Sequence, residues 1–313
     1  NLRDLDVHIP LNRLVCVTGV SGSGKSTLIE DVLYRALRTH QGKPTEAPGT
    51  HRALRGVEHI GAVVLIDQSP IGKTARSNPA SYVGAFEPIR KLFAAAPLAQ
   101  ERGYTAGTFS FNAGNGRCPT CQGSGFEHVE MQFLSDVYIR CPDCDGRRFR
   151  AEVLEVKLRA GSEFKVQSSK LTATAKSVAD VLDMTVTEAV EFFGGYPEVR
   201  RGLEPLTAVG LGYVKLGQPV PTLSGGEAQR LKLAGHLADA SGSKFGTLNS
   251  ELGTLFLFDE PTTGLHLDDV ATLLRAFETL IARGHSLVVI EHNLELIAAA
   301  DWIIDLGPEG GDG

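Results

Sequence analysis

Residues 14–28 read LVCVTGVSGSGKSTL and combine three successive local patterns. The apolar, β-rich run at 14–18 predicts a buried strand that includes Cys16. The glycine-rich stretch at 19–24 predicts a loop, and residues 25–37 have the apolar spacing of a helix. A glycine loop between a strand and a helix N-terminus lets backbone amides surround a phosphate group. The stretch therefore predicts an α/β fold with a phosphate site near its beginning.

The glycine loop matches the pattern G-x-x-x-x-G-K-[ST] from Gly19 to Ser26. In such a loop Lys25 is placed to reach the β- and γ-phosphates, and Ser26 to ligate Mg²⁺. We therefore expect ATP or ADP with Mg²⁺ as cofactors, and Lys25 as a catalytic residue. The predicted nucleotide contacts in this loop are Gly19, Ser21, Gly22, Ser23, Gly24, Lys25, Ser26 and Thr27.

A second apolar run, residues 255–258, predicts a buried strand that ends in Asp259 and Glu260. A carboxylate at a strand end can hold Mg²⁺, and its neighbour can polarise an attacking water molecule. Asp259 is therefore a predicted nucleotide and magnesium residue, and Glu260 a predicted catalytic residue. Further strands at 63–66 and 287–290 alternate with helical patterns, which favours a mostly parallel, doubly wound α/β sheet.

Residues 223–227 read LSGGE and precede an apolar helical pattern at 231–237. A serine and two glycines at a helix start offer a hydroxyl and amides to an anion. Here the chain resembles the ABC ATPase superfamily, whose signature motif contacts the γ-phosphate bound to a different module. The resemblance also makes Gln68 the Q-loop glutamine and His292 the switch histidine, both predicted to be catalytic. The predicted nucleotide contacts in the signature motif are Ser224, Gly225 and Gly226.

Two positions distinguish the chain from transporter-type ABC modules. No Phe, Tyr or Trp precedes Tyr34, so only His8 could take the place of the aromatic ring that stacks on adenine in many such modules. His266 stands where transporter-type modules usually have an aspartate. Both differences speak against a transporter subunit.

Two cysteine pairs share the register C-P-x-C-x-G-x-x-F at residues 118–126 and 141–149. Their C-x₂-C-x₁₉-C-x₂-C spacing is typical of a four-cysteine zinc site, with a redox dithiol pair as the alternative. Alternating apolar residues and a possible turn at 135–136 predict a β-hairpin between the pairs. Because no ligand position would stay open, we expect the metal to be structural. The predicted zinc ligands are Cys118, Cys121, Cys141 and Cys144.

Arginines flank the cysteine pairs and aromatic residues lie on the predicted hairpin, a combination that can grip a phosphate backbone and stack on bases. Acidic residues balance these arginines, so protein docking and a purely structural role remain alternatives. The stretch 69–104 has an excess of basic residues, which either line a phosphate contact or form a solvated face. The predicted DNA-binding residues are Arg117, Arg140, Arg147, Arg148, Tyr138, Lys73 and Arg76.

Over essentially its whole length the chain resembles the second ATPase half of the UvrA family, the damage-recognition ATPases of bacterial nucleotide excision repair. The resemblance implies double-stranded DNA, preferentially damaged, as the partner, and ATP use coupled to recognition of distorted DNA. It also implies a second ABC module in the same polypeptide and a homodimer. UvrB would bind through the first half, which this chain lacks. The matching stretches are residues 17–28, 67–72, 109–112, 181–186 and 259–266.

Polar stretches at 159–176 and 239–252 depart from the family's pattern. They leave open an alternative, a UvrA-like paralogue of antibiotic resistance whose zinc hairpin docks a protein. With one phosphate loop and one signature motif, the chain is expected to need a second ABC module for hydrolysis.

The 313 residues carry a net charge of −6, so contact with nucleic acid requires a local patch rather than a basic surface overall. No apolar run is long enough to span a membrane and no signal peptide is evident, which favours a cytoplasmic protein without membrane contact. The abrupt ends suggest a piece of a longer polypeptide.

We thus predict an α/β, ABC-type P-loop ATPase with an inserted four-cysteine zinc β-hairpin module and a helical signature subdomain. Residues 151–158 are expected to form a strand, and residues 177–193 and 197–209 helices. The predicted parts are an ATP-binding core at 1–108 and 241–313, the zinc-hairpin module at 109–158, and the signature subdomain at 159–240.

Overall fold

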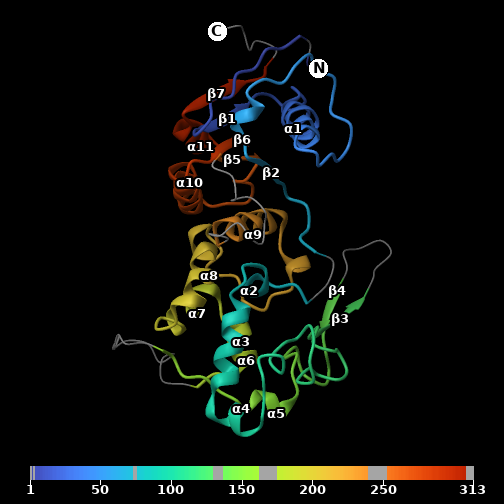
Figure 1. The fold of residues 1–313 in the computed structure, drawn as a ribbon, viewed down its shortest axis with the longest axis vertical. Coiled ribbons are helices and arrows are strands. Elements are labelled where there is room, and N and C mark those ends of the chain that lie inside the picture. The colour runs from blue at the N-terminus through green and yellow to red at the C-terminus, as the bar shows by residue number, and fades with distance from the viewer. Residues whose placement is uncertain are drawn as a thin grey trace. The chain divides into compact units, whose positions relative to one another are not determined.

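The computed structural model describes residues 2, 4–72, 76–129, 137–161, 175–238 and 252–307. The chain divides into two compact units (Figure 1). The first, here called the sheet unit, comprises Asn1–Ser69 and Asp239–Gly313, and the second, the helical unit, comprises Pro70–Ala238. In the described part of the chain, no helix combines the length and apolar character that a membrane crossing requires.

A five-stranded parallel sheet forms the core of the sheet unit, with the strand order β2-β5-β6-β1-β7. Parallel strands buried on both faces are continuous apolar runs, as the VVLI, LFLF and LVVI segments are. Cys16 lies with no exposed surface in β1, the interior strand between β6 and β7, as predicted. The strands are β1 (Leu14–Thr18), β2 (Ala62–Ile66), β5 (Thr254–Asp259), β6 (Ser286–Ile290) and β7 (Trp302–Asp305).

Helices flank this sheet on both sides (Figure 1). The predicted helix after the glycine loop is present, but it begins as the π-helix η1 (Thr27–Tyr34) and continues as α1 (Arg35–His40). Ile29 of η1 packs into the same apolar cluster as Val17 and Leu257, so the wide first turns are anchored on the sheet. The other helices in the described residues of this unit are η2 (Val57–His59), α10 (Leu267–Ala282) and α11 (Leu294–Ala299). The prediction of a doubly wound α/β fold is confirmed.

The helical unit contains mostly short helices. The predicted helix at 177–193 is two helices, because capping boxes at Ser177 and Thr185 start a new helix each. The elements are α2 (Pro79–Tyr82), α3 (Phe86–Ala95), α4 (Pro97–Glu101), α5 (Ala151–Leu154), α6 (Val178–Asp183), α7 (Val186–Phe192), α8 (Pro197–Ala208), η3 (Val220–Thr222) and α9 (Gly225–Ala238).

The predicted strand at 151–158 is wrong. Its first four residues form α5, and Leu158 makes only an isolated bridge to Lys176. The run AEVLEVKL is short and alternates only in part, and such a run does not distinguish a strand from a helical turn by periodicity. The side chain of Val153 is buried in the helical unit, and this burial favours the helical turn over a strand.

The predicted β-hairpin between the cysteine pairs is present (Figure 1). Strand β3 (Phe126–Val129) pairs antiparallel with β4 (Val137–Arg140). Residues 130–136, which include the predicted turn at 135–136 and part of the predicted apolar alternation, lie outside the described residues. Val137 and Ile139 expose 41% and 51% of their surface, so the hairpin presents aliphatic side chains to solvent.

Two phenylalanine pairs attach the chain just before the cysteine pairs to α3. Phe109 and Phe111 are buried. The ring centroid of Phe109 lies 5.4 Å from that of Phe93, and the ring centroid of Phe111 lies 4.7 Å from that of Phe86. Phe86 and Phe93 belong to α3, and aromatic pairs at such separations add to the stability of a core. The cysteine pairs therefore start from a rigid base.

Candidate functional site: a phosphate-loop pocket and a four-cysteine centre

A pocket of about 370 Å³ lies in the sheet unit at the glycine loop. Its wall combines the loop with the residues that follow β5 and β6. At Gly19 a side chain is excluded, because a Cβ atom would lie 2.0 Å from the carbonyl oxygen of Leu306. The lining residues are Leu2, Ser21, Gly22, Gly24, Lys25, Ser26, Thr27, Glu260, Ile290 and His292.

Lys25 is buried above the loop that precedes it. Its Nζ donates to the carbonyl oxygens of Gly19 at 2.9 Å and Val20 at 3.0 Å. Ser23 Oγ is buried and has no hydrogen-bond partner among the described residues. A buried hydroxyl without a hydrogen-bond partner destabilises the folded state unless a bound ligand supplies that partner. Lys25 and Ser23 therefore fit a phosphate group of a nucleotide.

Carboxylates gather at the carboxyl end of β5. Burial raises the pKa of Asp259, and the charges of Glu260 and Asp67 raise it further. Burial and the charge of Asp259 likewise raise the pKa of Glu30. Crowded carboxylates of this kind disfavour their own negative charge until a cation neutralises them. This donor set, with the Ser26 hydroxyl at the start of η1, fits Mg²⁺.

Glu260 contacts two of the other predicted catalytic residues. Its Oε1 lies 3.7 Å from His292 Nε2, and its carbonyl oxygen accepts a hydrogen bond of 3.4 Å from Gln68 Nε2. Its backbone has a positive φ of 44°, and its N–H donates to Ile290 O at 2.9 Å. The structure thus brings together Glu260, His292 and Gln68 from the ends of three strands.

Glu291 is a residue that sequence reasoning missed. It is 3% exposed, and its Oε1 accepts hydrogen bonds from the N–H and hydroxyl of Thr262. Its Oε2 accepts from the N–H groups of His292 at 2.6 Å and Asn293 at 2.9 Å. Glu291 therefore joins the loop after Glu260 to the loop that carries His292. The available signal was an acidic residue directly after the apolar run 287–290.

The signature motif begins α9 in the helical unit. Ser224 Oγ donates to Glu227 Oε2 at 3.0 Å and accepts from the Glu227 N–H at 3.3 Å. Tyr213 donates its hydroxyl to Glu227 Oε1 at 2.8 Å. Gly225 and Gly226 occupy the first turn of α9, and the nucleotide contact predicted for them stays a prediction.

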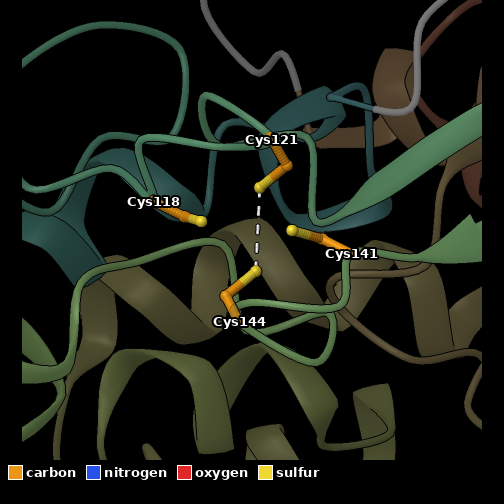
Figure 2. Close-up of side chains that lie close together, drawn as sticks. All are labelled: Cys118, Cys121, Cys141 and Cys144. Atoms are coloured by element: carbon orange, nitrogen blue, oxygen red, sulfur yellow. Dashed lines mark hydrogen bonds between the residues drawn. The ribbon is translucent and has the colours of Figure 1, made fainter.

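The four cysteines of the two pairs converge at one point of the helical unit (Figure 2). All four Sγ atoms lie within 4.8 Å of one another, and those of Cys121 and Cys144 are 3.7 Å apart. Four thiolates at about 2.3 Å from a tetrahedral zinc ion are separated by about 3.8 Å. Gly123 and Gly146 have φ values of 88° and 77°, the positive values expected for these knuckles. The cluster therefore fits Zn²⁺.

The predicted DNA-binding residues separate into exposed and enclosed groups. Arg147 and Arg140 are exposed, and Tyr138 is half-buried. Arg140 Nη1 lies 3.8 Å from Asp145 Oδ1. Arg76 and Arg117 hold the first cysteine pair, since each donates to the carbonyl oxygen of Gln122. Lys73 lies outside the described residues.

The DNA contact predicted for Arg148 is not compatible with this structure. The side chain is 2% exposed, and its guanidinium donates to backbone carbonyl oxygens inside the helical unit. A group enclosed in this way cannot reach a phosphate of bound DNA. The sequence places Arg148 beside the exposed Arg147, so the sequence pattern alone could not separate the two.

Similarity to known proteins extends over the whole chain. No protein-family profile matches the chain. UvrABC system protein A of Thermus thermophilus is 53% identical over 312 residues, which are 100% of this chain and 30% of that protein. The protein of the same name from Methanothermobacter thermautotrophicus is 52% identical, with the same coverage of 100% and 30%. The chain therefore spans less than a third of the length of these relatives.

A solved structure is similar as well. The crystal structure of UvrA2 from Deinococcus radiodurans superposes with a TM-score of 0.79 at 45% identity, over 97% of this chain and 34% of that one. The chain belongs to the UvrA family and has a parallel α/β fold built around a phosphate loop.

Proposed function

We propose that the chain is the C-terminal ATPase half of a UvrA-type protein, which uses ATP to control its grip on distorted DNA. The observation that carries this proposal is the pocket in which the glycine loop, Glu260 and His292 meet. Family membership supports the DNA-directed part, because the relatives bear the name of the UvrABC system.

In the proposed reaction Lys25 binds the β- and γ-phosphates of ATP, and the amides of residues 19–24 surround them. Ser26 and Asp259 would hold Mg²⁺, which would neutralise charge on the phosphates. Glu260 accepts a proton from the attacking water, and its 3.7 Å approach to His292 and the Gln68 hydrogen bond keep it oriented. Ser224, Gly225 and Gly226 contact the γ-phosphate of a nucleotide bound to a second module. Hydrolysis then requires that module, either in the same polypeptide or in a homodimer.

Zinc in this proposal has a structural role. Cys118, Cys121, Cys141 and Cys144 supply four thiolates, which leaves no position for a substrate. The Gly125 N–H donates to Cys121 Sγ at 3.3 Å and orients that ligand. When bound, the ion cross-links the two strand ends and fixes the direction of the hairpin.

DNA would meet the exposed part of the hairpin module. Arg140 and Arg147 are exposed and can contact phosphates, while Tyr138, Val137 and Ile139 offer surfaces that stack on bases or wedge between them. Lys73, Arg76 and Arg117 extend the basic set by sequence. Recognition would depend on shape and deformability, because varied lesions share no hydrogen-bonding pattern. UvrB would bind through the first half of the full protein.

Removal of the exposed arginines is expected to weaken DNA binding in a salt-dependent way. With Arg140→Gln and Arg147→Gln together, the slope of log affinity against log salt should become shallower by about 1 for each DNA phosphate that an arginine no longer neutralises. The measurement is fluorescence anisotropy of a labelled duplex, damaged or undamaged, at several salt concentrations. Arg201→Gln on α8 also removes an exposed arginine of the helical unit and serves as the control.

An unchanged slope in the double variant would contradict the assignment, as would an equal change of slope in Arg201→Gln. Failure of the intact parent protein to bind any duplex would favour a hairpin that docks a protein.

A further inference from the structure

Arg148 is enclosed in the helical unit in an unusual backbone conformation. It is 2% exposed and is one of the largest buried side chains in the described part of the chain. Its φ of 71° lies in the left-handed region, which residues other than glycine seldom adopt. Burial of a guanidinium carries a substantial desolvation cost, so its contacts must be specific.

The guanidinium connects two segments that are distant in sequence. Nη1 donates to the carbonyl oxygen of Gly123 at 3.4 Å, and Nη2 donates to that of Gly217 at 2.9 Å. Its Cζ lies 5.1 Å from the ring centroid of Phe111 and 5.8 Å from that of Phe126, within range of cation–π attraction. One side chain thus joins the first cysteine knuckle, the hairpin base and the Gly217 segment.

The backbone of Arg148 belongs to the cysteine centre itself. Its carbonyl oxygen accepts a hydrogen bond of 2.9 Å from the Cys118 N–H. Its N–H donates to Cys144 Sγ. Arg148 therefore contacts both cysteine pairs through its backbone, which fixes where its side chain enters the core.

Charge also links Arg148 to the centre. A zinc ion bound by four thiolates carries a net negative charge, which a buried cation nearby stabilises. A guanidinium is protonated at any physiological pH, so Arg148 supplies a permanent cation in this position.

The Gly217 segment leads directly to the signature motif. The Gly217 N–H donates to Leu182 O at 2.7 Å, and the Val220 N–H donates to Ser77 O at 2.8 Å. A Cβ atom at Gly217 would lie 2.8 Å from the Leu182 carbonyl oxygen, so this backbone is closely packed. Residues 220–222 then form η3, and Ser224 follows.

We propose that Arg148 is a positioning residue that ties the four-cysteine zinc centre to the segment leading into the signature motif. Its positive charge balances the negative charge of the zinc–thiolate group. Its two guanidinium hydrogen bonds fix the Gly217 backbone relative to the first cysteine pair. A change at the metal centre is thereby transmitted to residues 217–223. The inference rests on zinc in the centre and is independent of the proposed ATP and DNA roles.

The charge part is tested by zinc affinity, measured by competition with a chelating dye. Arg148→Met, which keeps the length but loses the cation, should weaken zinc binding by about 10- to 100-fold. Arg148→Lys keeps the cation and should stay within a few-fold of the unsubstituted chain. Arg147→Met removes a neighbouring exposed cation and should have little effect. Unchanged affinity in Arg148→Met, or an equally weakened affinity in Arg148→Lys, would overturn the charge balance.

The connection between the Gly217 segment and the first cysteine pair is tested by amide hydrogen exchange at saturating zinc. A lysine at position 148 cannot donate to both carbonyl groups as the planar guanidinium does. In Arg148→Lys the amide hydrogens of residues 217–223 should therefore exchange about tenfold faster or more. Peptides from α7 should keep their exchange rate. Equal exchange rates of residues 217–223 in the lysine variant and the unsubstituted chain would contradict the proposed connection. This comparison tests the proposal even if Arg148→Met does not fold.

Discussion

Glu260→Gln is expected to leave ATP bound while the rate of hydrolysis falls by about 10²- to 10⁴-fold, the usual contribution of a general base. Glutamine has nearly the same shape as glutamate but cannot accept the proton of the attacking water. The Glu260 backbone, held by Ile290 O and by Gln68, does not depend on the carboxylate. The loop should therefore keep its form, and nucleotide affinity should change little.

The rate should be measured as single-turnover hydrolysis in a parent protein that contains both ABC modules, with nucleotide binding followed separately. Glu295→Gln at the start of α11 provides a matched control, because Glu295 is exposed and its backbone N–H is bonded to Asn293. If Glu260→Gln hydrolysed ATP at the rate of the Glu295→Gln control, Glu260 would not be the base. If it lost ATP binding as well, its role would be structural.

Removal of the zinc ligands is expected to have the largest effect on stability. Cys118→Ser with Cys141→Ser removes one thiolate from each pair, and a chain that held one zinc ion should then hold none. Structural zinc contributes about 10–16 kcal/mol of apparent binding energy in small zinc domains. The hairpin has little core of its own, since Val137 and Ile139 are exposed. Loss of the ion should therefore unfold the hairpin module.

The two phenylalanine pairs limit how far this unfolding should spread. Phe109 and Phe111 pack on α3 through contacts that do not involve the metal, so the helices should keep their secondary structure. The measurements are zinc content, thermal unfolding and proteolytic cleavage between the cysteine pairs. Cys16→Ala in β1 is the control and should retain a full zinc content. Full zinc content in the double variant, or unchanged protease resistance, would contradict the ligand assignment.

Short-range spacing made much of the fold and site predictable. The glycine loop, the strand before it and the cysteine pairs each depend on residues a few positions apart, and Lys25 lies where the motif places it. Glu260 was predictable as an acidic residue at the end of an apolar strand, and His292 through the resemblance to ABC ATPases. The two lie together because parallel strands end at the same edge of a sheet. The four-part division of the chain remains a prediction.

Long-range packing accounts for what the sequence did not reveal. The Arg148 side chain is buried through a bond to Gly217, 69 residues further along the chain, and nothing near Arg148 in sequence signals it. Glu291 acts through Thr262, which belongs to another loop. The helical turn of α5 depended on burial of Val153 rather than on the local pattern.

Gln68 offers the most direct test of the central claim that ATP binding controls the affinity for DNA. It follows β2, contacts Glu260, and directly precedes Ser69, where the sheet unit ends along the chain. The measurement is the affinity of the two-module parent protein for a lesion-containing duplex, with and without a non-hydrolysable ATP analogue. We predict a shift of about fivefold or more, which Gln68→Ala abolishes without loss of nucleotide binding. Equal affinity in the two nucleotide states, or a shift that Gln68→Ala leaves intact, would contradict the account.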